Sequence, residues 1–228
     1  MRLLVRPYSL WLAYDLTQPN KISKMLPPHL ELTSIPILER DQYWTPKLLM
    51  NAYDVESLWM RGHRVEVQTI ALDKNKNTTH FVVLQCLSNV NLWDPIQGLA
   101  PANALCVSKH TSSSFHLRVS TNDRDPTMPY RNTEVLCVTG NLCAAKEEVS
   151  REFVIDSNRQ CYFGSYTRPF SLSFDERQVL QPVRCLASTG IVNTLWSTVR
   201  KARPSHAFVH DQSMTYDVDV TELWYDIF

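Results

Sequence analysis

The run 59–94 constrains the fold more than any other part of the chain, because it contains two long stretches of β-type sequence separated by a turn. In its first half polar and apolar residues alternate, so Arg64, Glu66 and Gln68 would share one face of a strand. A polar, turn-forming stretch follows at 73–77, and a second β-rich segment comes after it. The sequence therefore predicts a long antiparallel hairpin with a polar stripe along one face.

Most of the remaining chain also has β-type patterns. Further strands are expected at 7–14, 32–40, 47–55, 115–119 and 134–139, with a second hairpin over 151–165 and a final one joining 206–210 to 215–220. Short helices are expected after Pro19 and over 193–201. Many strands, few helices and only 5 glycines indicate an α+β, mainly β fold, namely a closed antiparallel β-barrel with a few short flanking helices. With no internal repeat or linker, we expect residues 1–228 to form a single domain.

Charge and cysteine patterns restrict the function classes. The chain has 23 basic and 23 acidic residues without a basic block, so a nucleic-acid partner is not expected. No apolar run approaches the length of a membrane span, and the six cysteines include no C-x-x-C pair. We therefore expect no membrane partner, reduced cysteines in the core, and a soluble, cytoplasmic protein.

Several common catalytic motifs are absent. The sequence has no G-x-S-x-G elbow, no phosphate-binding GK[ST] loop and no G-x-G-x-x-G segment. His206 and His210 lie near acidic residues of the following segment, yet no compact metal-ligand signature appears. We therefore predict no metal and no cofactor.

The polar stripe supplies the main candidate site. Arg61, His63, Arg64, Glu66 and Gln68 lie on the first strand of the central hairpin, and the preceding strand adds Asn51 and Tyr53. In a barrel this stripe can face the lumen, where the charged neighbour would keep Glu66 ionised. A solvated outer face with ordinary cross-strand ion pairs is the alternative, and the sequence leaves both open.

The N-terminal hundred residues resemble the acetoacetate decarboxylase-like superfamily. The likeness is carried by PYSLWLAYDL, the turn Leu26-Pro27-Pro28-His29-Leu30-Glu31-Leu32, the strand KLLMNAYDV, and MRGHRVEVQTIALD leading to FVVLQCLSN. The resemblance implies a β-barrel around a mostly apolar cavity. It also implies a Schiff-base lysine in the segment after the second hairpin strand, but here that segment, 93–103, contains no lysine or arginine. Lys109 is the nearest downstream amine, so the lysine mechanism is not expected.

The leading hypothesis is an enzyme, of lyase or isomerase/cyclase type, that binds a small, largely apolar organic metabolite in the barrel. It would perform lysine-independent acid–base chemistry, by isomerisation, cyclisation, dehydration or decarboxylation, on a carbonyl or carboxylate compound in biosynthesis. The expected catalytic residues are Tyr53, His63, Glu66 and Asp94. The expected substrate-binding residues are Asn51, Arg61, Arg64, Gln68, Trp93 and Asn103.

Two other functions use the same fold without chemistry. One is a non-catalytic binding protein for an apolar small molecule, and the other is an interaction scaffold whose barrel is filled. The enzyme and the non-catalytic binding protein would both have a small-molecule substrate or ligand as partner. The sequence leaves the oligomeric state open, with a homo-oligomer among the alternatives.

Overall fold

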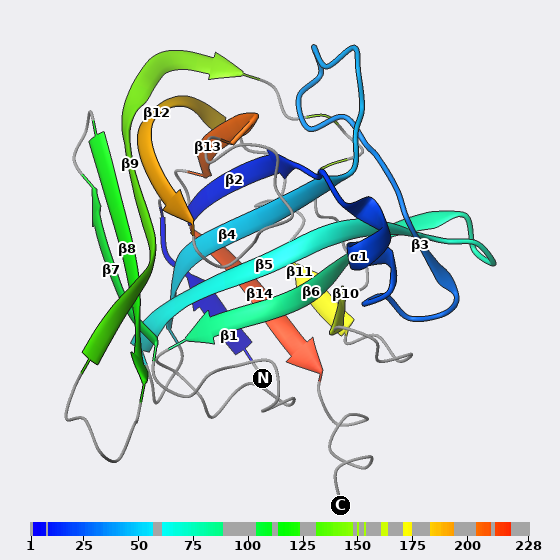
Figure 1. The fold of residues 1–228 in the computed structure, drawn as a ribbon, viewed down its shortest axis with the longest axis horizontal. Helices are drawn as coiled ribbons and strands as arrows, with labels where there is room; N and C mark the ends of the chain where they lie inside the picture. Colours follow the sequence, from blue (N-terminus) through cyan, green and yellow to red (C-terminus); the bar gives the residue numbers. More distant parts are fainter. Residues whose placement is uncertain are drawn as a thin grey trace, which may run out of the picture.

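The computed structural model describes residues 2–7, 9–56, 61–88, 104–110, 114–123, 131–147, 150, 153, 161–163, 171–174, 183–193, 204–210 and 213–219. In this part of the chain fourteen strands join in one strongly curved sheet, and one short helix lies beside it (Figure 1). No described helix is long and apolar enough to cross a bilayer. The mainly β class predicted from the sequence is confirmed.

The first half of the chain forms the centre of the sheet. Its elements are β1 (Arg2–Val5), β2 (Ser9–Asp15), α1 (Pro19–Ser23), β3 (Leu30–Leu32), β4 (Lys47–Glu56), β5 (Arg61–Asp73) and β6 (Thr78–Ser88). The predicted central hairpin is therefore present as β5 and β6, which pair antiparallel. α1 begins at Pro19, whose fixed φ and missing N–H suit the first turn of a helix.

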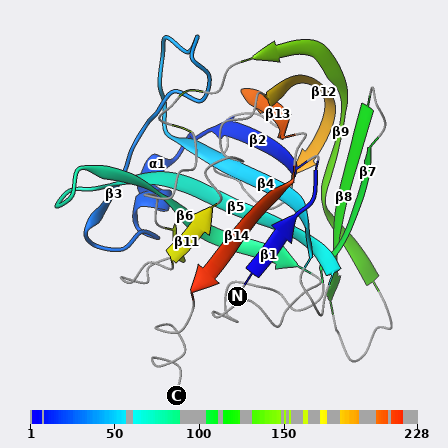
Figure 2. The same cartoon turned by 180° about the vertical axis from the view of Figure 1, so that it is seen from behind.

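The second half extends the sheet and adds its shorter branches. Its strands are β7 (Ala104–His110), β8 (Ser114–Asp123), β9 (Arg131–Glu147), β10 (Cys161–Phe163), β11 (Ser171–Phe174), β12 (Val183–Asn193), β13 (His206–His210) and β14 (Met214–Asp219). Seen from behind, β1 and β14 run side by side across the concave sheet, with β11 next to β14 (Figure 2).

The predicted closed antiparallel barrel is not found among the described strands. The sheet follows the order β10-β6-β5-β4-β2-β13-β12-β9-β8-β7, and its end strands β10 and β7 do not pair with each other. β10 also pairs with β6 in parallel, which departs from an all-antiparallel ladder. The described strands thus form a curved, open sheet with short branches.

The two faces of the central sheet bury different sets of side chains. One face packs under α1 and β8, where Ile22, Leu48, Val65 and Phe115 belong to one apolar cluster. The other face is covered by the segment 33–46, here called the strap. Alternate residues of each strand point to opposite faces, so β2, β4, β5 and β6 contribute to both clusters.

The strap contributes apolar side chains to the second cluster. This cluster contains Trp11, Ala13, Ile35, Ile37, Leu38, Leu49, Ile70, Phe81, Val83, Cys86, Phe153 and Cys161. We call the sheet surface beneath the strap the covered face. Cys86 and Cys161 are both buried in this cluster.

Three expected elements differ from the structure. The strand predicted over 32–40 is not formed, and the observed β3 ends at Leu32. Pro36 cannot donate to a strand ladder, and the strap that contains it crosses the sheet instead. The final hairpin was wrong: β13 pairs with β2 and β12, while β14 pairs with β1 and β11. In the hairpin expected over 151–165, Phe153 lies in a turn and not in a strand, and β10 pairs with β6; residues 151, 152, 154–160, 164 and 165 lie outside the described residues. The helix expected over 193–201 lies outside the described residues after Asn193.

Candidate functional site

A largely buried carboxylate, that of Glu66, is the centre of the candidate site on the covered face. The hydroxyl of Tyr53 donates a 2.7 Å hydrogen bond to Oε1 of Glu66. Nη2 and Nε of Arg64 donate to the same oxygen over 3.1 and 3.3 Å, and Nε2 of Gln68 donates to Oε2 over 2.6 Å. Three side chains from two adjacent strands, β4 and β5, therefore bind this one carboxylate.

Strand register explains why these residues meet. Tyr53 is the cross-strand partner of Arg64, and Asn51 is the partner of Glu66. Residues two apart on a strand share a face, so Arg64, Glu66 and Gln68 form a continuous polar stripe on β5. The predicted stripe is confirmed as a structural feature, and its burial excludes the solvated outer face that the sequence also allowed.

The charges of this cluster are held largely away from water. The side chains of Arg64 and Glu66 retain only 8% and 13% of their exposure. A buried carboxylate is costly unless it is paired and hydrogen-bonded, and here both conditions are met. An ionised carboxylate offers about four acceptor positions. Because Oε2 of Glu66 accepts only from Gln68 among the described residues, it retains room for a donor from a ligand.

Apolar side chains surround the polar stripe on the covered face. Trp11 is the cross-strand partner of Asn51, and its ring meets that of Phe153 edge to face at 5.7 Å. The rings of Phe81 and Phe153 are 6.0 Å apart at 79°. Such edge-to-face contacts favour a rigid aromatic wall. The arrangement is an apolar surface with a few fixed polar groups, which is typical of small-molecule sites.

Two buried polar atoms beside the cluster lack hydrogen bonds. Oδ1 of Asn51 and Oγ of Ser9 have no partner in the described part of the chain, although their residues are only 7% and 1% exposed. Buried polar atoms are nearly always hydrogen-bonded in native proteins. Asn51 was predicted from the sequence as a binding residue, whereas Ser9 was not, because one serine in an apolar strand carries no distinguishing pattern.

The other predicted site residues lie elsewhere. His63 is on the opposite face of β5, where Nδ1 of its ring contacts the carboxylate of Asp54. Arg61 is exposed at the start of the same strand. The structure thus brings together Asn51, Tyr53, Arg64, Glu66 and Gln68, but not His63 or Arg61. Trp93, Asp94 and Asn103 lie outside the described residues.

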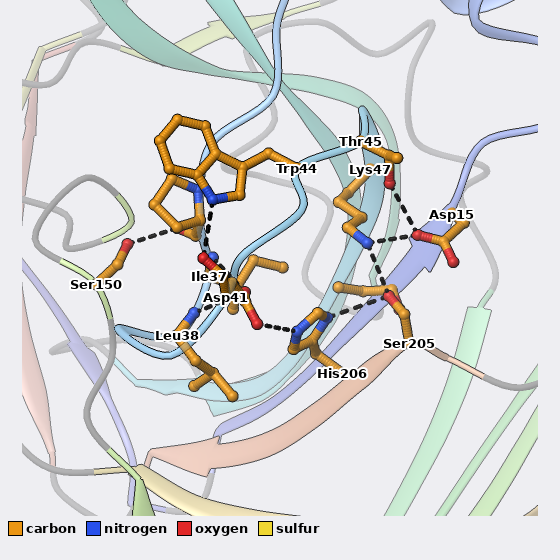
Figure 3. A network of polar contacts seen from close by, with 12 residues as sticks. Asp15, Ile37, Leu38, Asp41, Trp44, Thr45, Lys47, Ser150, Ser205 and His206 are labelled. Atoms are coloured by element: carbon orange, nitrogen blue, oxygen red, sulfur yellow. Dashed lines mark hydrogen bonds and ion pairs between the residues drawn. The ribbon is translucent and has the colours of Figure 1, made fainter.

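A second polar network holds the strap to the sheet at the far end of β2 (Figure 3). Oδ2 of Asp41 accepts hydrogen bonds from the amides of Ile37 and Leu38 over 2.9 and 3.0 Å. Oδ1 of the same carboxylate lies 3.0 Å from Nε2 of His206. Burial alone would raise the pKa of Asp41, but the Leu38 amide and His206 outweigh it and lower the pKa below 3.8.

The network continues from His206 to Lys47, which is half-buried. Nδ1 of His206 is 3.1 Å from Oγ of Ser205, which accepts a 3.2 Å hydrogen bond from Nζ of Lys47. Nζ of Lys47 also forms an ion pair with Asp15. Burial tends to raise the pKa of Asp15, but the hydrogen bond and charge of Lys47 lower it overall. The sequence showed no sign of this network, because its members come from three distant segments.

The described residues contain no group of histidine, cysteine, aspartate and glutamate side chains arranged to hold a metal ion. His206 contacts Asp41 of the strap rather than the acidic residues of the following segment.

Comparison with known proteins finds likeness in structure but not in sequence. No family model matches the chain, and no curated protein sequence matches it. The structure is similar to that of the enduracididine biosynthesis enzyme MppR, with a TM-score of 0.54 at 7% identity, over 96% of this chain and 84% of that one. It is also similar to an acetoacetate decarboxylase-like enzyme from Sphingomonas wittichii RW1, with a TM-score of 0.51 at 7% identity, over 95% of this chain and 90% of that one.

These likenesses show the class of fold. The chain has the acetoacetate decarboxylase-like fold, as the Leu26–Leu32 turn and the strands around it predicted. At 7% identity the likeness carries no residue roles, so the chemistry has to be argued from the side chains of this chain.

Proposed function

We propose that this protein is an enzyme that binds a small, largely apolar carbonyl or carboxylate compound on the covered face and moves a proton with Glu66. The observation that supports this most directly is the largely buried Glu66 carboxylate, held by Tyr53, Arg64 and Gln68 beside an aromatic wall. A carboxylate in such surroundings can act as a general base or, once protonated, as a general acid.

The two oxygens of Glu66 have different roles in this proposal. Tyr53 and Arg64 bind Oε1 and hold the carboxylate in one orientation. Oε2, which Gln68 positions, takes a proton from the carbon next to the substrate carbonyl and can return it to another atom. Such a transfer is the first step of isomerisation and of dehydration or cyclisation beside a carbonyl. A biosynthetic role fits this chemistry, and biosynthesis is also the role named for MppR.

The proposed chemistry does not use a lysine. On the covered face Lys47 is 10% exposed in its side chain, and its ammonium group is ion-paired with Asp15 and bonded to Ser205. Schiff-base formation requires an amine that is free to attack the substrate carbonyl, whereas Asp15 and Ser205 already engage this one. We therefore expect that borohydride treatment with keto acids leaves no covalent adduct on Lys47 or Lys109, as mass spectrometry of the digested protein would show.

Proton exchange next to a carbonyl tests the proposal directly. The protein is incubated in D₂O with a panel of small ketones and keto acids, and deuterium uptake at the α-carbon is followed by NMR. We expect catalysed exchange with at least one compound and a loss of about 10²-fold or more in Glu66→Gln. The matched control is Glu56→Gln, because Glu56 pairs with Arg6 at the surface. Equal exchange rates in wild type and Glu66→Gln would contradict the proposal.

A non-catalytic binding protein is the second candidate. One observation favours it: Tyr53, Arg64 and Gln68 already occupy most of the acceptor capacity of Glu66. For a pure binding protein, the same NMR samples would show line broadening or saturation transfer for a bound ketone, with deuterium uptake no faster than in buffer.

A further inference from the structure

Asn51 and Ser9 leave two hydrogen-bonding atoms unused in a buried part of the covered face. Oδ1 of Asn51 is an acceptor, and the hydroxyl of Ser9 can both donate and accept. Neither has a hydrogen-bond partner among the described residues, although both residues are more than nine-tenths buried. An unsatisfied buried polar group destabilises the folded state, so two such groups side by side point to a ligand that satisfies them.

The two residues lie next to the proposed catalytic carboxylate. Ser9 precedes Leu10, which is the cross-strand partner of Ala52, so Ser9 lies opposite Tyr53. Asn51 pairs with Trp11 on one side and with Glu66 on the other. Ser9 and Asn51 are therefore diagonal neighbours on the same face, a relation that lets side chains converge on one small group.

We propose that the ligand of this site carries a hydroxyl group, which donates a hydrogen bond to Oδ1 of Asn51 and accepts one from Oγ of Ser9. A hydroxyl matches both atoms at once, because it is both donor and acceptor. An ammonium group could also donate to Asn51. However, Arg64 already neutralises Glu66, so a second buried cation would lack a counter-charge.

This inference rests on the proposed function, since it names the substrate class of the same site. It places the hydroxyl beside the aromatic residue Trp11 and one strand away from Glu66. The ligand is then a small hydroxylated carbonyl compound, and Asn51 and Ser9 are the residues that select it. A site that hydrogen-bonds a substrate hydroxyl rejects the analogue without it, because its polar groups are then left unpaired.

Affinities for a matched pair of probes test the selection. The probes are 4-hydroxy-2-butanone and 2-butanone, which differ by one hydroxyl, and their Kd values are measured by NMR titration. We expect the hydroxy ketone to bind wild type about tenfold more tightly or better. Asn51→Ala and Ser9→Ala should each remove most of this preference. The controls Asn20→Ala and Ser23→Ala, at two exposed positions of α1, should keep it.

Thermal stability gives a second readout that needs no ligand. Ser9→Ala removes an unpaired buried hydroxyl and leaves the strand intact, so it should raise the Tm by about 2 °C or more. A lower Tm would mean that the hydroxyl is already satisfied in the free protein, and it would overturn the proposal.

The remaining outcomes separate this inference from the proposed function. Equal Kd values for the two ketones in wild type, or a preference that persists in Asn51→Ala, would overturn the inference. So would the absence of binding by either probe up to millimolar concentration. Failure of the proposed function is seen in a different experiment, as α-proton exchange that does not depend on Glu66.

Discussion

Nε2 of His206 lies 3.0 Å from Oδ1 of Asp41, a residue 165 positions earlier in the chain. Asp41 belongs to the strap, whereas His206 begins β13, which pairs with β2. The contact therefore fastens the strap to the sheet whose covered face carries Glu66 (Figure 3). It links the fold to the candidate site, because Ile37 and Leu38 of the strap pack on the same face.

Asp41→Asn should weaken the fold in a pH-dependent way. The pKa of Asp41 is lower in the folded protein than its ordinary value of 3.8, so the carboxylate stabilises the fold above that pH. This contribution is lost as the pH falls through the folded pKa. We expect Asn to lower the free energy of unfolding by about 1–3 kcal/mol at pH 7, and less below pH 3.8.

Urea unfolding across this pH range measures the effect. The control is Glu31→Gln, whose exposed ion pair with Lys74 should contribute about 0.5 kcal/mol or less. A pH-independent loss in Asp41→Asn would show that the carboxylate acts through shape rather than charge.

Tyr53→Phe removes the hydroxyl that donates to Glu66 over 2.7 Å. We expect the free energy of unfolding to fall by about 1–2 kcal/mol, since a bond to a charged acceptor is lost within a buried cluster. Where α-proton exchange is measurable, it should slow by about tenfold, because Glu66 loses one of its orienting partners. Tyr43→Phe is the matched control, since Tyr43 is 89% exposed; equal losses in the two variants would argue against a special role for Tyr53.

Arg64 and Glu66 should behave as one unit. Arg64→Met leaves a buried carboxylate without its counter-charge and should cost about 3–5 kcal/mol. The double variant Arg64→Met with Glu66→Leu removes both charges, and we expect it to recover much of this loss. Chemical unfolding of the wild type, both single variants and the double variant gives the coupling energy. Additive losses would mean that the 3.1 Å contact contributes nothing to the folded state.

Asn77 in the central turn tests the local backbone. Its φ is 53°, in the left-handed region, where Gly and Asn are tolerated and β-branched residues are not. Asn77→Val should therefore lower the free energy of unfolding by about 1–2 kcal/mol, and Asn77→Gly should change it little. Asn75→Val is the control in the same turn, measured by urea unfolding. A similar cost at both positions would contradict the role assigned to the Asn77 backbone.

Local patterns were sufficient for the central strands and for the members of the polar stripe. Period-two alternation places Arg64, Glu66 and Gln68 on one face whatever the rest of the chain does, and Pro19 marks the start of α1. The same alternation does not say which face becomes buried. That depends on the strap, whose Ile35, Ile37 and Leu38 cover the stripe side of the sheet.

Pairing between distant segments was decided only by the tertiary structure. The chain positions of β13 and β14 suggest a hairpin, but each finds a partner near the N-terminus, β13 with β2 and β14 with β1. Backbone groups of a strand have the same pattern whichever neighbour they bond, so a single strand does not encode its partner. For the same reason Ser9 and Asn51 become a candidate binding pair only once β2 lies beside β4, where Oγ of Ser9 and Oδ1 of Asn51 are buried without partners among the described residues.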